Sequence, residues 1–104
     1  MAYRVEVLPR AARDLRRMYR TINAAHAQQA QAWFNGLTEL ILYLDRNPSR
    51  GGRIPEGHGL RQVLHGKGRN VYRVIYEVDD ADKVVSVVHV RHSAQDAFRP
   101  DMDA

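Results

Sequence analysis

The sequence predicts an α+β fold: one strand, a helical hairpin and then a three-stranded antiparallel meander, with the helices packed on one face of the sheet. Two patterns predict it. Apolar residues alternate with polar ones near the N-terminus and again after residue 59, which is typical of strands, whereas residues 9–44 carry apolar residues at helical spacing. A chain of 104 residues with 44% apolar side chains fits a single domain spanning residues 1–104 with a small core.

The predicted first strand is Tyr3–Val7, where charged and apolar residues alternate. Pro9 follows at a position that suits the first turn of a helix, because that turn needs no donor from the proline nitrogen. The residues that share the apolar face of this helix are Ala11, Leu15, Met18, Tyr19 and Ile22. The opposite face is basic and carries Arg10, Arg13, Arg17 and Arg20. We therefore expect an amphipathic helix with a stripe of arginines.

A second helix is predicted from one continuous apolar stripe, and Asn23 can end the first helix or cap the second. The stripe consists of Ala30, Trp33, Phe34, Leu37, Leu40, Ile41 and Leu44. Because the joint between the two helices is short, they are expected to form an antiparallel hairpin. Residues 45–59 contain several glycines and prolines and are predicted as a loop.

Three strands are predicted after this loop, at Leu60–Leu64, Val71–Val78 and Lys83–Arg91. Short turns join them, so consecutive strands are expected to pair in antiparallel fashion. With the hairpin on one face, the other face of the sheet is expected to be exposed or to contact a partner. The tail, residues 93–104, is polar, and we expect it to be loosely ordered.

The alternation within the last two strands predicts which side chains share a face. In the middle strand, Tyr72, Val74, Tyr76 and Val78 point one way and Arg73 points the other. In the last strand, Val85, Val87, His89 and Arg91 alternate with Val84, Ser86, Val88, Val90 and His92. Arg73 is a charge within an apolar strand, so it is either paired internally, for example with Glu6 or Glu77, or directed at a ligand phosphate.

The composition excludes several classes of protein. The chain has no cysteine, which excludes disulfide scaffolds, thiolate zinc sites and cysteine nucleophiles. No apolar run approaches the roughly 20 residues that span a bilayer, and the charged N-terminus does not resemble a signal peptide. We therefore expect a soluble cytoplasmic domain with no membrane partner.

The net charge is +4, and arginine dominates it: fourteen arginines and two lysines stand against twelve acidic residues. Arginine binds phosphate through two parallel hydrogen bonds and stacks on bases, so this bias favours a nucleic acid or an acidic protein as the partner. The alternative interpretation is a solvated arginine face without a partner.

Three titratable or cationic side chains, His89, Arg91 and His92, gather near the end of the last predicted strand. Histidine can act as a general acid or base near neutral pH, and arginine can stabilise the charge of a phosphoryl transition state. Together they suffice for metal-independent cleavage of RNA, and the alternative is a set of surface residues at a basic sheet edge. No spacing of ligands matches a metal site and no phosphate-binding glycine loop is present, so no metal or other cofactor is predicted.

Two stretches of the sequence resemble the RelE/ParE superfamily of bacterial toxins. The first is Val5–Pro9 with the Ala12-x-Asp14-Leu15 that follows it, and the second is the block Tyr72–Val78, followed by an acidic turn, a valine-rich strand and His92. With the loop that ends in Gly59-Leu60-Arg61, these stretches cover nearly the whole chain. The resemblance implies a toxin of a type II toxin–antitoxin system, as in plasmid stabilisation, whose partner is a small antitoxin that wraps the toxin with its C-terminal segment.

The superfamily has two activities: RelE-like members cleave messenger RNA in the ribosomal A site, whereas ParE-like members inhibit DNA gyrase. The first interpretation is an mRNA interferase, an RNA-binding endoribonuclease whose partners are the ribosome and mRNA. The resemblance then implies His92 as general acid or base, and Arg73, with Arg61 or Arg91, as the phosphate ligands. The residues expected to contact RNA are Arg61, Lys67, Arg69, Arg10, Arg13, Arg17 and Arg20.

The sequence departs from the RelE pattern at three positions, one of them near Phe98 or Arg99, where RelE-like members carry a terminal tyrosine. Val63 stands where RelE-like members carry a second strand lysine, and Ser93 stands at or near their C-terminal arginine. His92-Ser93 with the later Phe98 resembles a second nuclease subgroup instead. The alternatives are therefore a gyrase inhibitor without nuclease chemistry, with DNA gyrase as its partner, and a degenerate, non-toxic member that only binds its antitoxin.

Overall fold

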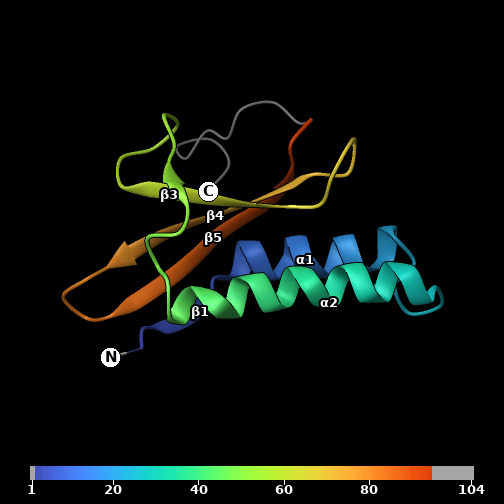
Figure 1. The fold of residues 1–104 in the computed structure, drawn as a ribbon, viewed down its shortest axis with the longest axis horizontal. Helices are drawn as coiled ribbons and strands as arrows, with labels where there is room; N and C mark the ends of the chain where they lie inside the picture. The colour runs from blue at the N-terminus through green and yellow to red at the C-terminus, as the bar shows by residue number, and fades with distance from the viewer. Residues whose placement is uncertain (1, 95–104) are drawn as a thin grey trace.

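The computed structural model describes residues 2–94 and places two helices against one face of a five-stranded mixed sheet (Figure 1). The strands are β1 (Arg4–Val7), β2 (Gly52–Arg53), β3 (Leu60–His65), β4 (Tyr72–Asp79) and β5 (Val84–His92). The helices are α1 (Pro9–Thr21) and α2 (Gln28–Leu42), and a short 3-10 helix, η1 (Tyr43–Asp45), follows α2. The α+β fold and the order of its main elements are confirmed. Most of the tail that we expect to be loosely ordered, from residue 95 on, lies outside the described residues.

The strand order in the sheet is β1-β5-β4-β3-β2. The predicted meander is confirmed, because β3, β4 and β5 pair with their chain neighbours in antiparallel fashion. β1 pairs in parallel with β5, from Arg4 opposite Val84 to Val7 opposite Val87. The prediction that residues 45–59 form only a loop is wrong at Gly52–Arg53, which pairs with β3 as the edge strand β2. Two residues are too few to show a periodic pattern.

The two helices form the predicted hairpin. α1 ends at Thr21, and Asn23 follows with a φ of 59°, a left-handed conformation that asparagine tolerates better than most residues. α2 ends at Leu42, earlier than the apolar stripe predicts, and the last residue of the stripe, Leu44, lies fully buried in η1. Within residues 2–94, neither helix has the length and apolar character that crossing a membrane requires.

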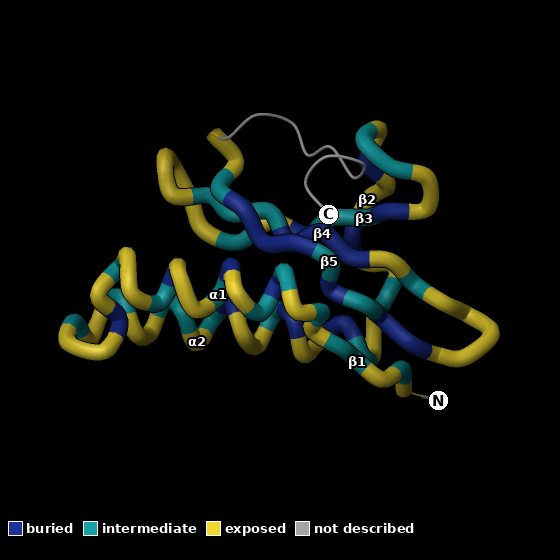
Figure 2. Tube along the Cα trace, turned by 180° about the vertical axis from the view of Figure 1, so that it is seen from behind, coloured by how far each residue is buried: buried dark blue, intermediate teal, exposed yellow. Residues whose placement is uncertain are grey.

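The main core lies between the helical hairpin and the sheet, and Figure 2 shows its buried stretches along β4 and β5. Its buried members are Ala11, Met18, Leu37, Ile41, Leu44, Val63, Val74, Tyr76, Val85, Val87 and Val90. On the opposite face, a second and smaller cluster joins Ile54, Leu60 and Ile75. Part of the face that the sequence leaves open is therefore covered by the connection between β2 and β3.

A β-bulge reverses the phase of β5 near its end. Tyr76 lies opposite Val87, but the next residue of β4, Ile75, lies opposite His89, so Val88 is an extra residue. Val90 consequently joins the helix-side core with Val85 and Val87. The predicted alternation in this strand is therefore wrong beyond Val87, because it assumes an uninterrupted period of two.

Candidate functional site

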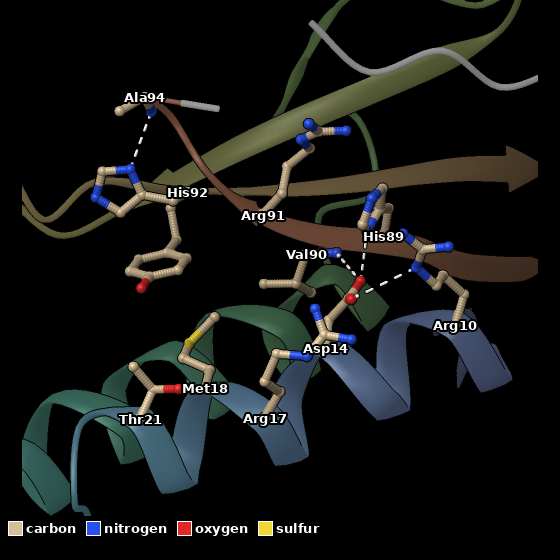
Figure 3. A pocket seen from close by; sticks show the side chains of 11 residues that line it. Arg10, Asp14, Arg17, Met18, Thr21, His89, Val90, Arg91, His92 and Ala94 are labelled. Carbon is tan, nitrogen blue, oxygen red and sulfur yellow. Dashed lines mark hydrogen bonds and ion pairs between the residues drawn. The ribbon is translucent and has the colours of Figure 1, made fainter. Parts of the chain in front are cut away.

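A groove of about 560 Å³ lies between α1 and the C-terminal end of β5 (Figure 3). Its basic and histidine residues come from both elements, and its one acidic residue comes from the helix. The lining consists of Arg10, Asp14, Arg17, Met18, Thr21, Tyr72, His89, Val90, Arg91, His92 and Ala94. The groove forms because β1 pairs only with the first half of β5, which leaves α1 beside the second half.

Asp14 joins α1 to this second half of β5. Its Oδ2 accepts a hydrogen bond from the backbone N–H of Val90 at 3.1 Å and a second one from Nδ1 of His89. An ionised carboxylate only accepts, so Nδ1 of His89 carries the proton of this bond. Arg10 Nε lies 3.5 Å from the other carboxylate oxygen, one helical turn away. β1 ends opposite Val87 and therefore offers no backbone carbonyl to Val90. The Asp14 carboxylate accepts the hydrogen bond from Val90 in its place.

The pKa of Asp14 lies below its ordinary value, because its hydrogen bonds and nearby positive charges outweigh the effect of burial. Burial by itself raises the pKa, because it disfavours the charged carboxylate. The hydrogen bonds from His89 and Val90 outweigh burial, and the charges of His89 and Arg10 add to them. Asp14 is therefore a fixed negative charge at the floor of a basic groove.

His92 stands at the other end of the groove, against Tyr72. Their rings meet edge to face with centroids 4.9 Å apart, and Nδ1 of His92 accepts a hydrogen bond from the N–H of Ala94 at 3.0 Å. Tyr72 in turn contacts Trp33 at 5.4 Å, and Trp33 contacts His65 at 4.8 Å. A row of four rings thus links β5, β4, α2 and β3 on the helix side of the sheet.

Arg73 lies on the far face of the sheet, the face away from the helices. Its Nε donates to Oε1 of Gln62 at 2.6 Å, and one Nη lies 2.8 Å from a carboxylate oxygen of Glu56. The internal pairing that the sequence left open is present, with Glu56 in place of the Glu6 or Glu77 offered as examples. Arg91 lies directly opposite Arg73 in the strand register.

The predicted catalytic residues are divided between the two faces. His92 lies opposite Tyr72 on the helix side, whereas Arg73 lies opposite Arg91 on the far side. Figure 3 likewise draws the Arg91 side chain directed away from α1. The structure therefore brings Arg73 and Arg91 together in the strand register, and Arg91 also lines the groove with His92, but Arg73 does not line it.

The other predicted RNA-contacting residues do not form one surface. Arg61 is on the helix side, and its Nη1 donates to the carbonyl of Gly51 at 2.7 Å. Lys67 and Arg69 are exposed in the turn between β3 and β4. On α1, Arg10 and Arg17 line the groove, whereas Arg13 and Arg20 are exposed and do not line it.

Sequence reasoning missed Asp14, Tyr72, Gln62 and Glu56 as members of these sites. Asp14 could have been found, because it lies between Ala11 and Met18 at helical spacing, on the buried face of an otherwise apolar stripe. Glu56 offered no such signal, since it lies in a loop without periodicity. Among residues 2–94, no three histidine or acidic side chains lie close enough together to hold a metal ion.

Comparison with protein families decides the classification. The family described as the ParE toxin of the type II toxin–antitoxin system parDE matches residues 5–97. The chain belongs to the ParE toxin family. The likeness to RelE/ParE toxins inferred from the strand motifs is thereby confirmed. No curated protein sequence matches the chain.

Solved structures share the fold of this ParE-family chain at low sequence identity. The RelBE2 toxin–antitoxin complex from Mycobacterium tuberculosis has a TM-score of 0.59 at 24% identity, over 88% of this chain and 99% of that one. The chromosomal ParDE system from Pseudomonas aeruginosa has a TM-score of 0.70 at 17% identity, over 88% and 96%. The intact Escherichia coli RelBE complex has a TM-score of 0.64 at 18% identity, over 90% and 100%. These similarities concern the fold, which RelE and ParE proteins share.

Proposed function

We propose that this ParE-family toxin inhibits growth by binding DNA gyrase, as the sequence resemblance implies for ParE-like members, and not by cleaving messenger RNA. The observation that carries this proposal is the separation of His92 from Arg73, because the two side chains lie on opposite faces of the sheet. A general acid or base must reach the same phosphate that the arginines hold, within hydrogen-bonding distance. Side chains on opposite faces of a sheet do not meet that requirement.

The contacts that Arg73 and His92 already make within the protein support the same proposal. The Arg73 guanidinium already binds Glu56 and Gln62, so it is engaged within the protein. His92 has one ring nitrogen in a hydrogen bond to Ala94 and its ring against Tyr72. These contacts fix both side chains as parts of the structure, and a toxin that acts through a binding surface needs nothing more from them.

A cognate antitoxin is the second part of the proposal. The structural neighbours from M. tuberculosis, P. aeruginosa and E. coli were solved as toxin–antitoxin systems or complexes, which supports such a partner here. The net charge of +4 makes an acidic binding segment the complementary choice. Gene context gives a quick check, because a short adjacent reading frame with a DNA-binding N-terminus would encode that partner.

The test is induction of the chain in a susceptible bacterium, with mapping of messenger RNA 5′ ends and a gyrase supercoiling assay on the purified protein. We expect inhibited supercoiling, intact messages and full toxicity of His92→Ala and Arg73→Gln variants that fold normally. In-frame cuts in translated messages that disappear in His92→Ala would overturn the proposal. The absence of any growth defect would overturn it as well and would favour a non-toxic, antitoxin-binding member.

Ribosome-dependent mRNA cleavage is the second candidate, and the groove is the observation that favours it. His92 borders the groove together with Arg10 and Arg17, so an acid or base and two cations face one hollow. In that case the phosphate ligands are Arg10 and Arg17 of α1 in place of Arg73 and Arg91. Cleavage should then fall by roughly 10²–10⁴-fold in His92→Ala and in Arg17→Ala, and stay unchanged in Arg20→Ala, which is exposed outside the groove.

A further inference from the structure

A second hollow, here called the outer cleft, lies where α1 and α2 run side by side (Figure 1) and has a volume of about 310 Å³. Its lining consists of Leu15, Arg16, Tyr19, Arg20 and Phe34. The two arginines follow the buried Asp14 and Met18 by two positions each, which places them about 200° further around α1. The outer cleft therefore opens away from the sheet and shares no lining residue with the groove beside β5.

The floor of the outer cleft is apolar and is held from both helices. The rings of Tyr19 and Phe34 meet edge to face with centroids 5.0 Å apart, and Leu15 and Phe34 pack against the main core. All three side chains are partly buried, so their positions are fixed before any partner binds. Tyrosine and arginine around a packed recess are typical of the residues that contribute most to protein–protein binding. The outer cleft therefore has the composition of an anchor site for another protein.

The rim of the outer cleft carries two guanidinium groups on successive turns of α1. Arg16 and Arg20 are both exposed, and among residues 2–94 neither takes part in an ion pair. Like charges four residues apart repel each other on a helix surface, and carboxylates of a partner would relieve this repulsion. The rim therefore favours an acidic partner.

The combination of apolar floor and basic rim narrows the chemistry of that partner. A second copy of the chain would bring the same arginines against each other, and like charges across an interface oppose binding. A nucleic acid would contact the arginines through its phosphates but would leave the apolar floor without a partner. An amphipathic helix fits both features, because carboxylates at i and i+4 repeat at the spacing of Arg16 and Arg20 while its apolar face covers the floor.

We propose that the outer cleft is the surface through which this toxin contacts gyrase, and that it binds an acidic amphipathic helix of the enzyme. The inference rests on the proposed function, because it names the contact surface for the gyrase binding proposed above. A folded enzyme presents preformed helices, and a preformed recess binds them without an ordering cost. The groove beside β5 fits the apolar face of such a helix less well, because the Asp14 carboxylate lies at its floor.

The test compares the concentrations at which purified variants half-inhibit supercoiling by gyrase. Arg16→Glu/Arg20→Glu reverses both rim charges with residues of similar helix propensity, so this concentration should rise roughly tenfold or more. The matched control is Arg46→Glu/Arg53→Glu, which changes the net charge equally at two exposed positions outside the outer cleft. An equal rise in both double variants would show an effect of net charge alone and would overturn the proposal, as would no rise in the first.

A second set of variants tests the outer cleft without reversing any charge. Tyr19→Ala removes one ring of the floor and should raise the half-inhibitory concentration roughly tenfold. Its control is Tyr43→Ala, because Tyr43 is 51% exposed and lies outside the outer cleft. If the charge reversal folds poorly, Arg16→Gln/Arg20→Gln removes the rim charges more gently, and circular dichroism shows which variants are folded. Unchanged inhibition by folded Tyr19→Ala and Arg16→Gln/Arg20→Gln overturns the proposal.

The outcomes separate this inference from the proposed function. A wild-type chain that leaves supercoiling unaffected contradicts the proposed function, and the inference fails with it. Wild-type inhibition that persists in the folded variants of the outer cleft contradicts the inference alone. Two other results also overturn it: wild-type binding to plasmid DNA without gyrase that the same variants lose, which identifies a nucleic-acid contact, and loss of antitoxin binding with gyrase inhibition retained, which assigns the outer cleft to the antitoxin.

Discussion

The buried charged residues on the two faces of the sheet have different kinds of hydrogen-bond partner. On the helix side, Asp14 is 7% exposed and accepts hydrogen bonds from the backbone of one residue and the ring of another, both in β5. On the far side, the Glu56–Arg73 pair joins two side chains, one of which belongs to a loop. A charge that replaces a backbone partner takes part in the hydrogen bonding of the strand itself.

The same difference applies to the elements that carry each charge. Asp14 belongs to a helix of 13 residues whose position the core fixes. Glu56 belongs to a connection whose apolar contacts are made by its two ends, Ile54 and Leu60. Local opening requires few buried contacts, so it is less costly in the loop than in the helix. Local opening is therefore expected to cost more on the helix side than in the loop on the far side.

The largest expected effect is that of Asp14→Ala on stability. The substitution leaves the buried N–H of Val90 and the buried ring of His89 without their acceptor, and breaking a buried ion pair from one side costs roughly 3–5 kcal/mol. Urea unfolding followed by circular dichroism measures the change. Asp82→Ala, in the exposed turn after β4, is the control and should stay within about 0.5 kcal/mol. A loss below about 1 kcal/mol in Asp14→Ala would show that the helix side is not tied together by this residue.

The pH dependence of the free energy of unfolding also tests the stabilising role of Asp14. Because the pKa of Asp14 is lower in the folded chain than in the unfolded one, its contribution is complete above the ordinary aspartate pKa. That contribution is lost as the pH falls toward and through the lowered pKa, since the unfolded chain takes up the proton first. The free energy of unfolding should therefore fall less steeply with acid in Asp14→Asn than in the wild-type chain. Parallel curves for the two proteins would contradict the assignment.

Tyr76→Phe is expected to have the next largest effect, about 1–3 kcal/mol. The buried hydroxyl of Tyr76 donates to the carbonyl of Pro48 at 2.7 Å and accepts from the N–H of Gly51 at 2.8 Å, which ties the loop before β2 to β4. Burial raises the pKa of Tyr76, so the wild-type chain should lose stability as the pH rises above about 10, and the variant should lose less. Tyr72→Phe keeps its ring contacts and serves as the control. Equal losses in the two variants would show that the hydroxyl of Tyr76 contributes nothing specific.

The assignment of several side chains to one or the other face of the sheet could be predicted from the sequence. The alternation in β4 correctly places Tyr72 and Val74 on the face opposite Arg73, because no bulge interrupts that strand and the period of two holds throughout. The order of the helices and of the longer strands follows from hydrophobic periodicity in the same way. Sequence patterns of this kind report which face of one element is buried, and they succeed wherever an element is regular.

The features of the sites that the sequence did not predict depend on contacts between segments that are distant in the chain. The bulge at Val88 has no distinguishing residue type, yet it decides that Val90 and His92 lie on the helix side of the sheet. Asp14 meets His89 across 75 positions of sequence, and Glu56 meets Arg73 from a loop that has no pattern. The predicted cluster of His89, Arg91 and His92 follows the linear sequence. All three residues border the groove, but Arg91 and His92 are directed to opposite faces of the strand.

On the far side, Glu56→Gln should cost about 1 kcal/mol of stability, clearly less than Asp14→Ala. A glutamine can still accept a hydrogen bond from Arg73, and the base of the loop stays anchored by Ile54 and Leu60. Urea unfolding measures this loss. A cost as large as that of Asp14→Ala would show that this pair stabilises the fold as strongly as the buried carboxylate on the helix side.

The smallest effect is expected for Arg10→Ala, and it tests whether Asp14 acts through β5 or through the basic residues around it. The Arg10 side chain is 37% exposed and its Nε is 3.5 Å from Asp14, a distance and an exposure at which an ion pair contributes about 0–0.5 kcal/mol. Arg13→Ala, one turn along the exposed face, is the matched control. If Arg10→Ala and Arg13→Ala unfold at the same urea concentration as the wild-type chain, the stabilising role of Asp14 rests on Val90 and His89. A large loss in Arg10→Ala alone would instead make the arginines of the groove part of the rigid side, and they would then be poor candidates for binding a partner.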